Sequence, residues 1–324
     1  MSESKTILLF GMPRSGTTWI GKIFDSHKDT FYLHEPDSVV PDYSIPLLIS
    51  ANSTYKNRLK ANIEKWLQPE AEKVIASRPF FKKSYLNIFQ FTLFIVTAYL
   101  CKVTAKLNLP FMRNPIRFQA TPPVIVWKSV ESLGRTAEIK NVSSADAVQI
   151  LRHPCGQVAS TLRGDELRLF DGGIPIYEDW DLFDKLLQQS GEERFVLEDI
   201  KKMPPESRLA LRWGLINDYA LKSTKALSQQ NVTIVLLYED MCRDPKGKSQ
   251  ELFAELNLSF SNETERFIND SISSEDSAYY STNKSPLVAA YKWRDQLSKE
   301  QQDNILNIVK QFESGAYYLN DFVK

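Results

Sequence analysis

The sequence predicts an α/β fold, a doubly wound parallel sheet with helices on both faces. Three observations predict it. Short apolar runs, typical of strands buried on both faces, recur along the 324-residue chain. Segments with helical periodicity separate these runs, which implies βαβ crossovers. No repeat or linker divides the sequence, so we expect one domain over residues 1–324, with a mostly helical cap inserted at residues 41–123.

The predicted strands are continuous or nearly continuous apolar runs. They are Thr6–Phe10, Phe31–Leu33, Val124–Trp127, Ala147–Leu151 and Thr233–Leu237. The predicted helices show apolar residues at three- and four-residue spacing. They are Thr17–Ser26, Ile45–Leu67, Phe91–Lys106, Cys155–Arg163, Ser207–Ser228, Lys248–Leu256 and Ser298–Phe312.

The bulk composition limits the classes of partner. The chain has 40 basic and 40 acidic residues, so no global charge attracts it to nucleic acid, and any anion site must be local. Its three cysteines form no CxxC pair, which argues against a disulfide framework and a cysteine zinc site. A reducing, cytoplasmic location fits these cysteines best. The apolar run near the N-terminus leads straight into a glycine loop and predicts a strand rather than a signal peptide.

One stretch, Leu86–Val103, approaches the length that spans a bilayer. Polar residues interrupt it at Asn87, Gln90, Thr92 and Thr97. We therefore expect a buried or pocket-lining helix at residues 86–103. A surface that touches a membrane or a partner is the alternative.

The first strand is followed by GMPRSGTTW, residues 11–19, in the strand, glycine turn and helix order of a phosphate loop. Backbone N–H groups at a helix N-terminus can hold a phosphate there. A kinase or ATPase loop needs a lysine after its second glycine, but Gly16 is followed by Thr17. The cation comes earlier, at Arg14. The loop therefore suits an anion other than a magnesium nucleotide, and a tight turn without a ligand is the alternative.

This loop resembles the [KR]-x-G-[ST]-[ST] motif of the sulfotransferases that use 3′-phosphoadenosine 5′-phosphosulfate (PAPS), in particular the carbohydrate-type and bacterial members. The resemblance implies a P-loop-like phosphosulfate-binding loop, release of 3′-phosphoadenosine 5′-phosphate (PAP), and no required metal. By the same resemblance Trp19 stacks on the adenine or lies beside it. The residues implied in binding the 5′-phosphosulfate are Arg14, Ser15, Gly16, Thr17 and Thr18.

Three later segments also resemble this family. In VQILRHPCGQVAS, Arg152 follows a strand and Ser160 comes eight positions later, as in the family's 3′-phosphate site. In VLLYEDMCRDP, Tyr238 would lie near the adenine. The segment YKWRDQLSKE is similar to one that folds over the phosphate end of the nucleotide in relatives. Its candidate contact residues are Lys292, Trp293 and Arg294.

Sulfuryl transfer needs charge stabilisation and a base for the acceptor proton. Arg14 and Lys128, at the end of the strand VIVWK, are the candidate stabilisers. At the position of Lys128, cytosolic sulfotransferases carry the sequence Lys-Thr-His. This chain has Lys-Ser-Val there, so the catalytic histidine of those enzymes is absent. In FYLHEP, Glu35 matches a carboxylate near Glu-Pro in carbohydrate-type relatives and is the first candidate base. His34 is the second, because its ordinary pKa near 6.5 suits proton abstraction.

The predicted cap is rich in aromatic residues, which predicts an acceptor pocket with apolar walls. They are Phe80, Phe81, Tyr85, Phe89, Phe91, Phe94 and Tyr99. We expect a small-molecule acceptor with a hydroxyl or an amine, such as a metabolite, a sugar or a lipid-linked group. Two alternatives remain: a nucleotide or small-molecule kinase, disfavoured by the missing lysine, and a non-catalytic protein that binds PAP.

Overall fold

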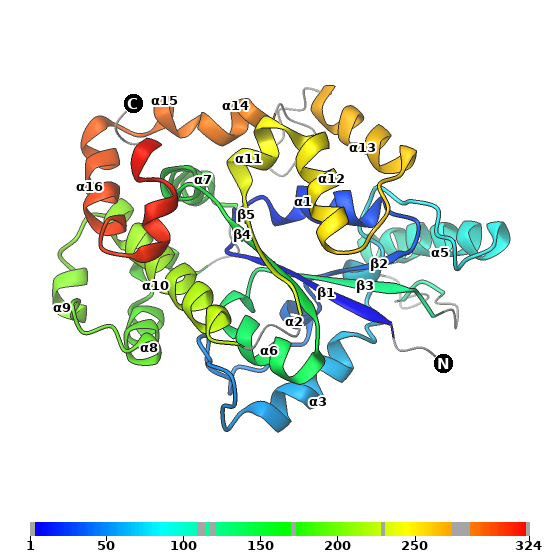
Figure 1. Ribbon diagram of the computed structural model, residues 1–324, viewed down its shortest axis with the longest axis horizontal. Coiled ribbons are helices and arrows are strands. Elements are labelled where there is room, and N and C mark those ends of the chain that lie inside the picture. Colours follow the sequence, from blue (N-terminus) through cyan, green and yellow to red (C-terminus); the bar gives the residue numbers. More distant parts are fainter. Residues whose placement is uncertain are drawn as a thin grey trace.

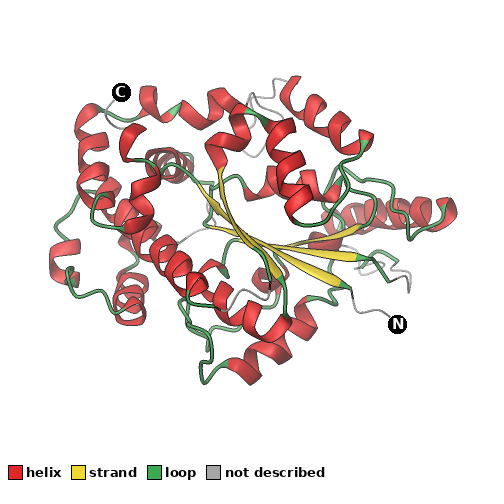
Figure 2. Cartoon of the chain, viewed as in Figure 1, coloured by secondary structure: helices red, strands yellow, loops and turns green. Residues whose placement is uncertain are grey.

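A computed structural model describes residues 4–108, 114–116, 121–169, 173–227, 231–273 and 286–321. Within these residues one parallel sheet has the strand order β2-β3-β1-β4-β5 and crosses the centre of the molecule (Figure 2). Its strands are β1 (Lys5–Gly11), β2 (Thr30–His34), β3 (Val124–Ser129), β4 (Asp146–Leu151) and β5 (Thr233–Leu237). The chain starts in the middle of the sheet and adds strands on both sides. The predicted doubly wound fold and all five predicted strands are confirmed.

The central strand β1 is buried on both faces, which explains its unbroken apolar run. Helices on one face pack around Ile7 and Leu9 (Figure 1): α1 (Thr17–Asp25), α11 (Tyr238–Arg243), α12 (Pro245–Glu255) and α13 (Asn262–Ser273). Helices on the other face pack around Leu8 and Phe10: α3 (Lys56–Trp66), α6 (Thr136–Ser143), α7 (Pro154–Glu166), α10 (Pro205–Lys225) and α16 (Lys299–Val309). Alternation along one strand thus divides the core into two layers.

Other helices lie at the edges of this core or connect its layers. They are α2 (Pro36–Val39), α4 (Glu72–Ile75), α5 (Ile88–Lys106), α8 (Trp180–Ser190), α9 (Leu197–Ile200), α14 (Pro286–Tyr291) and α15 (Trp293–Gln296). Short 3₁₀ turns occur at Leu133–Arg135, Ile176–Glu178, Glu313–Tyr317 and Leu319–Asp321. The region predicted as a cap contains α3, α4 and α5. Of these, α3 packs against α6, whereas α4 packs against the edge strand β2.

The strand register brings the functional segments to one edge. Leu9 of β1 pairs with Lys128 of β3 and with Val148 of β4. Since all the paired strands are parallel, their carboxyl ends open onto the same edge of the sheet. The glycine loop, Lys128 and Arg152 follow or end these strands, so the fold gathers them there.

Two helix predictions need correction. The predicted helix over Ile45–Leu67 begins only at Lys56. Ile45 and Ile49 are buried in irregular backbone, and Asn52 adopts a left-handed conformation with φ 62° that a helix does not contain. The apolar spacing there therefore reflects packing of a loop against the core.

The second correction concerns residues 86–103, predicted to be buried or pocket-lining. Asn87 and Gln90 form a capping box, so α5 starts at Ile88, three residues earlier than predicted. Phe94 lies against the core, but Phe89 is 70% exposed and Val103 is 53% exposed. The helix lines a pocket with one side only, and the expectation that it is buried is wrong for the other side.

Candidate functional site

The glycine loop between β1 and α1 is tightly wound. Gly16, the N-cap of α1, has φ 85°. A Cβ atom at Gly16 would lie 2.2 Å from Cε2 of Tyr238, and one at Gly11 would lie 2.6 Å from Oγ of Ser15. Both positions therefore require glycine. The close turn leaves the first N–H groups of α1 directed at the space beyond the sheet edge, where an anion can accept from them.

The loop also holds hydroxyl groups at the start of this helix. Ser15 is 1% exposed, and its Oγ has no hydrogen-bond partner among the described residues. Thr17 is buried and Thr18 is half-buried. A buried hydroxyl without a partner costs free energy unless a ligand supplies one. The loop therefore fits a phosphate or phosphosulfate group.

The second predicted anion site is in direct contact with this loop. Nε of Arg14 donates to Oγ of Ser160 at 3.0 Å, across 146 residues of sequence. Nη1 of Arg152 donates to the carbonyl oxygen of Arg14 at 2.6 Å. The Arg152 guanidinium lies 4.8 Å from the ring centroid of Tyr238. Two guanidinium groups, a serine and an aromatic ring from three separate segments thus form one cluster.

A buried polar network fixes the backbone next to Arg152. Glu239 accepts from the backbone N–H of His153 at 3.0 Å, and the Tyr318 hydroxyl donates to Glu239 at 2.9 Å. Nε1 of Trp213 donates to the carbonyl oxygen of Arg152 at 3.0 Å. Burial, followed by Arg294 and Arg152, lowers the pKa of His153 to about 3. His153 is therefore neutral and structural, and it caps α7 by accepting from the N–H of Cys155 at 3.2 Å.

The aromatic residues predicted near an adenine are both buried. Trp19 is 6% exposed, and its Nε1 donates to Oγ of Ser271 at 3.1 Å. Its ring meets Tyr238 edge to face, with the centroids 6.4 Å apart. Burial raises the pKa of Tyr238, so its hydroxyl stays protonated. The two rings form a wall next to the loop, and their contact with adenine stays a prediction.

The C-terminal segment reaches the same cluster through its backbone. Nη2 of Arg152 donates to the carbonyl oxygen of Ala289 at 3.2 Å. Trp293 is 3% exposed and stacks on His153 with the centroids 4.4 Å apart. Lys292 and Arg294 are exposed. The structure thus packs Trp293 behind Arg152, while contacts of Lys292 and Arg294 with a nucleotide stay predictions.

Glu35 and Lys128 form an ion pair at the ends of β2 and β3. The Glu35 carboxylate contacts Nζ of Lys128, and the Glu35 N–H donates to the Lys128 carbonyl at 2.9 Å. Burial would raise the pKa of Glu35, but the Lys128 ammonium outweighs it and lowers that pKa. Burial also lowers the pKa of Lys128, partly offset by Glu35. We assign charges to both groups at neutral pH, because each stabilises the ionised form of the other.

His34 lies next to this pair. Its Nε2 is 3.9 Å from Oε1 of Glu35, and its Nδ1 is 3.0 Å from the hydroxyl of Tyr32. Burial and then the Lys128 charge lower the pKa of His34 to about 4. Its imidazole is therefore neutral at pH 7. Both predicted base candidates thus lie beside Lys128 in their deprotonated forms.

Asp37 links the segments that carry Glu35 and Lys128, and the sequence analysis missed this residue. Its carboxylate accepts from the hydroxyl of Ser132 at 2.6 Å, from the hydroxyl of Ser129 and from Nε1 of Trp127 at 3.3 Å. These bonds tie α2 to the end of β3 and so position Glu35 against Lys128. The available signal was a Pro-Asp helix start together with two serines just after a strand.

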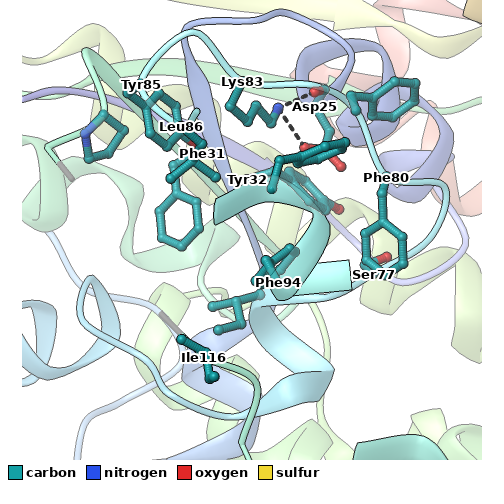
Figure 3. Close-up of a pocket in the computed structure, with 14 residues that line it drawn as sticks. Asp25, Phe31, Tyr32, Ser77, Phe80, Lys83, Tyr85, Leu86, Phe94 and Ile116 are labelled. Carbon is teal, nitrogen blue, oxygen red and sulfur yellow. Dashed lines mark hydrogen bonds and ion pairs between the residues drawn. The ribbon is translucent and has the colours of Figure 1, made fainter. Parts of the chain in front are cut away.

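An apolar pocket lies beside β2 (Figure 3). Five of the seven aromatic residues predicted to line it do so: Phe80, Phe81, Tyr85, Phe91 and Phe94. The other two, Phe89 and Tyr99, are exposed instead. Tyr32 also lines the pocket and reaches His34 through its hydroxyl. The pocket is thus connected to the base candidates through one side chain.

Buried charges lie at one side of this pocket, and the sequence analysis missed them as well. Asp25 pairs with Nζ of Lys22 at 2.7 Å and with Nζ of Lys83 at 3.0 Å. Lys22 is fully buried, and its ammonium lies 5.3 Å from the Tyr32 ring centroid. Burial would raise the pKa of Asp25, but the two lysines lower it. One carboxylate thus pairs with two ammonium groups, and further donors of Lys22 and Lys83 bond to the backbone carbonyl oxygens of Pro79 and His27, which ties the end of α1 to the pocket wall.

Known proteins match this chain over most of its length. Residues 6–262 match a family model described as "Sulfotransferase family". Carbohydrate sulfotransferase 1 of Mus musculus and that of Rattus norvegicus are each 21% identical over 333 residues, covering 92% of this chain and 75% of theirs.

Solved structures also align with the chain. A sulfotransferase from Alicyclobacillus acidocaldarius aligns with a TM-score of 0.44 and 11% identity, covering 100% of this chain and 96% of that one. Mouse sulfotransferase SULT7A1 complexed with PAP aligns with a TM-score of 0.43 and 13% identity, covering 98% and 88%. The matched range of the family model contains the glycine loop, Glu35, Lys128 and the Arg152–Ser160 pair. This chain is an enzyme of the sulfotransferase family.

Proposed function

We propose that this protein transfers a sulfuryl group from PAPS to a hydroxyl group of a small-molecule acceptor and releases PAP. The observation that supports PAPS most strongly is the hydrogen bond between Arg14 and Ser160. It joins a phosphate loop at the start of α1 to a second basic site at the start of α7. A nucleotide with anionic groups at both its 5′ and 3′ positions suits two adjacent basic sites, with an aromatic wall beside them.

The reaction needs one displacement at sulfur. The acceptor oxygen forms a bond to sulfur while the bond between sulfur and the bridging phosphate oxygen breaks. The acceptor proton passes to a base, and PAP leaves with the bonding electrons. Lys128 and Arg14 carry the positive charge that stabilises the sulfuryl and bridging oxygens. Glu35, in contact with Lys128, receives the proton.

The acceptor is proposed to place its apolar part in the pocket beside β2. Phe80, Phe94 and Tyr32 supply apolar walls there (Figure 3). Tyr32 connects this space to His34, which lies 3.9 Å from Glu35. A molecule with a hydroxyl at one end and an apolar body matches this arrangement. Apolar walls suit it better than they suit a long polysaccharide.

Arg152→Ala is expected to weaken PAP binding by about 10- to 100-fold, because it removes a charged contact to the 3′-phosphate. Isothermal titration with PAP, ADP and magnesium-ATP measures this. The parent protein should bind PAP more tightly than ADP, and this preference should disappear in the variant. Arg163→Ala changes an exposed arginine of the following helix, α7, and should leave PAP affinity unchanged.

Other results would support the two alternatives. Binding of magnesium-ATP but not PAP would indicate a kinase. Binding of PAP without transfer of labelled sulfate to sugars, phenols, lipids or amines would indicate a non-catalytic protein. Equal affinity for PAP and ADP in the parent would contradict the role given to Arg152 and Ser160.

Glu35→Gln is expected to lower kcat by about 10²- to 10⁴-fold, the usual contribution of a general base. His34→Asn should lower kcat less than about tenfold, because His34 contacts the Tyr32 hydroxyl at 3.0 Å and lies 3.9 Å from Glu35, which suits a positioning role. The parent's activity should be constant between about pH 6 and 8. The active form is the carboxylate, so activity should fall only as the pH drops towards the lowered pKa of Glu35. A greater loss in His34→Asn than in Glu35→Gln would reverse the assignment.

A further inference from the structure

The fully buried side chains of helix α5 are small or polar, whereas many of its large apolar side chains are exposed. Its buried residues are Thr97, Ala98, Cys101 and Thr104. The hydroxyls of Thr97 and Thr104 donate to carbonyl oxygens of the same helix, those of Leu93 at 2.9 Å and Leu100 at 3.0 Å. A helix on the surface of a soluble core has the opposite arrangement, with large apolar residues inward. The outer face of α5 therefore needs an apolar partner.

The exposed apolar residues of α5 form one stripe, which we call the α5 stripe. It consists of Ile88, Phe89, Val96, Tyr99, Leu100, Val103 and Leu107. At 3.6 residues per turn these positions lie within an arc of about 120°. Among the described helices, α5 alone is long and apolar enough to cross a bilayer, with a mean hydropathy of 1.6. A contiguous exposed apolar surface of this kind marks an interaction site.

Tyr99 is the one residue of the α5 stripe with a hydrogen-bonding side chain, and tyrosine is typical of membrane–water interfaces. Thr92, which lies within the same arc of the helix, donates to the carbonyl oxygen of Ile88 at 2.8 Å and is satisfied within the helix. A protein interface typically contains about one hydrogen bond per 100–200 Å². A surface with a single hydrogen-bonding side chain among seven apolar positions suits the interface of a bilayer better than it suits a protein partner.

The segment that carries the stripe is basic. Residues 73–123 contain eight lysines and arginines and no aspartate or glutamate, although the whole chain has equal numbers of both signs. Those that the structure describes as exposed are Lys73, Arg78, Lys82 and Lys106. The Arg78 guanidinium lies 5.9 Å from the ring centroid of Tyr99, at the border of the stripe. This local positive charge is complementary to an anionic surface.

We propose that the α5 stripe docks the protein onto an anionic lipid bilayer, with α5 lying in the plane of the interface. Its opposite face packs on the protein, and Lys102 pairs with Glu72 of the preceding helix at 3.2 Å, so the helix lies on the bilayer rather than crossing it. In Figure 1, α5 lies at one end of the molecule, beyond the edge strand β2. The cytoplasmic leaflet carries the anionic lipids that match this charge.

Vesicle flotation of the full chain tests this proposal without reference to catalysis. We expect the protein to float with vesicles of phosphatidylcholine and phosphatidylglycerol (3:1) and to float poorly with phosphatidylcholine alone. Binding should weaken as salt rises, because the basic residues contribute. Val103→Asp should lower the partition coefficient at least tenfold, because it places a charge in the centre of the stripe.

Val196→Asp is the matched control. Val196 is 55% exposed and Val103 is 53% exposed, so each substitution adds one negative charge at an equally exposed valine. Val196→Asp should bind vesicles like the parent, and both variants should bind PAP like the parent, which shows that they are folded. Equal vesicle binding by both variants, or no binding by the parent, would overturn the proposal. Concentration-dependent self-association of the parent that Val103→Asp abolishes, without vesicle binding, would assign the stripe to a protein interface instead.

Discussion

Gly16→Ala is expected to abolish measurable PAP binding and to destabilise the protein. Gly16 has φ 85°, a conformation that costs a residue with a side chain about 1 kcal/mol. Its new methyl group would also lie 2.2 Å from the ring of buried Tyr238. Either the ring or the loop must move, and both belong to the nucleotide site. Titration calorimetry with PAP and thermal unfolding with and without PAP measure the two effects.

Gly191→Ala separates backbone strain from crowding. Gly191 has φ 67°, in the same left-handed region, but a Cβ atom there meets no atom within 4 Å. It lies at the end of α8 and is expected to cost about 1 kcal/mol of stability without any change in PAP affinity. If Gly16→Ala bound PAP as tightly as Gly191→Ala does, the close contact with Tyr238 would not shape the site.

Lys128→Met is expected to lower kcat by about 10²- to 10³-fold, with a smaller change in PAP affinity. Methionine keeps a similar length and removes the charge from a position that is 1% exposed. The variant also removes the main group that lowers the pKa of Glu35, so that pKa should rise. Because the carboxylate is the proposed base, the pH at which activity falls should move upward. The pH dependence of kcat measures both effects.

Lys140→Met provides the control for this variant. Lys140 is also buried, and its Nζ donates to the carbonyl oxygen of Val232 at 2.9 Å, away from the Glu35–Lys128 pair. This substitution should lower the unfolding temperature and leave kcat and its pH profile unchanged. A kcat for Lys128→Met within threefold of the parent would show that Lys128 only supports the fold.

The sequence predicted the sheet well because its strands are buried on both faces. Such strands need continuous apolar runs, and these runs remain recognisable without tertiary information. Helix α13 was missed, because its sequence is mostly polar and only Phe267 and Ile268 among its large residues are buried. The helix predicted at residues 45–67 was too long for the opposite reason. Its first part is irregular, but it buries apolar residues at a spacing that resembles that of a helix.

The site was predictable where its chemistry lies in local motifs. The glycine loop and the Arg152–Ser160 pair were recognisable, but their hydrogen bond joins residues that are 146 positions apart and follows only from the fold. The supporting groups were not predictable for the same reason. Asp37 and Asp25 resemble ordinary surface carboxylates in sequence, and only packing shows that they are buried with specific partners.

The position of β1 at the centre of the sheet makes nucleotide binding a late event in folding. Lys5 of β1 pairs with Val124 of β3, and Ile7 pairs with Asp146 of β4. Contacts between such distant segments form slowly, because long loops must close first. The glycine loop is therefore ordered only once three remote segments have assembled. A nucleotide therefore binds only the native state and not the unfolded chain. At a nucleotide concentration of 100 Kd, this binding should add about 2.7 kcal/mol to the free energy of unfolding.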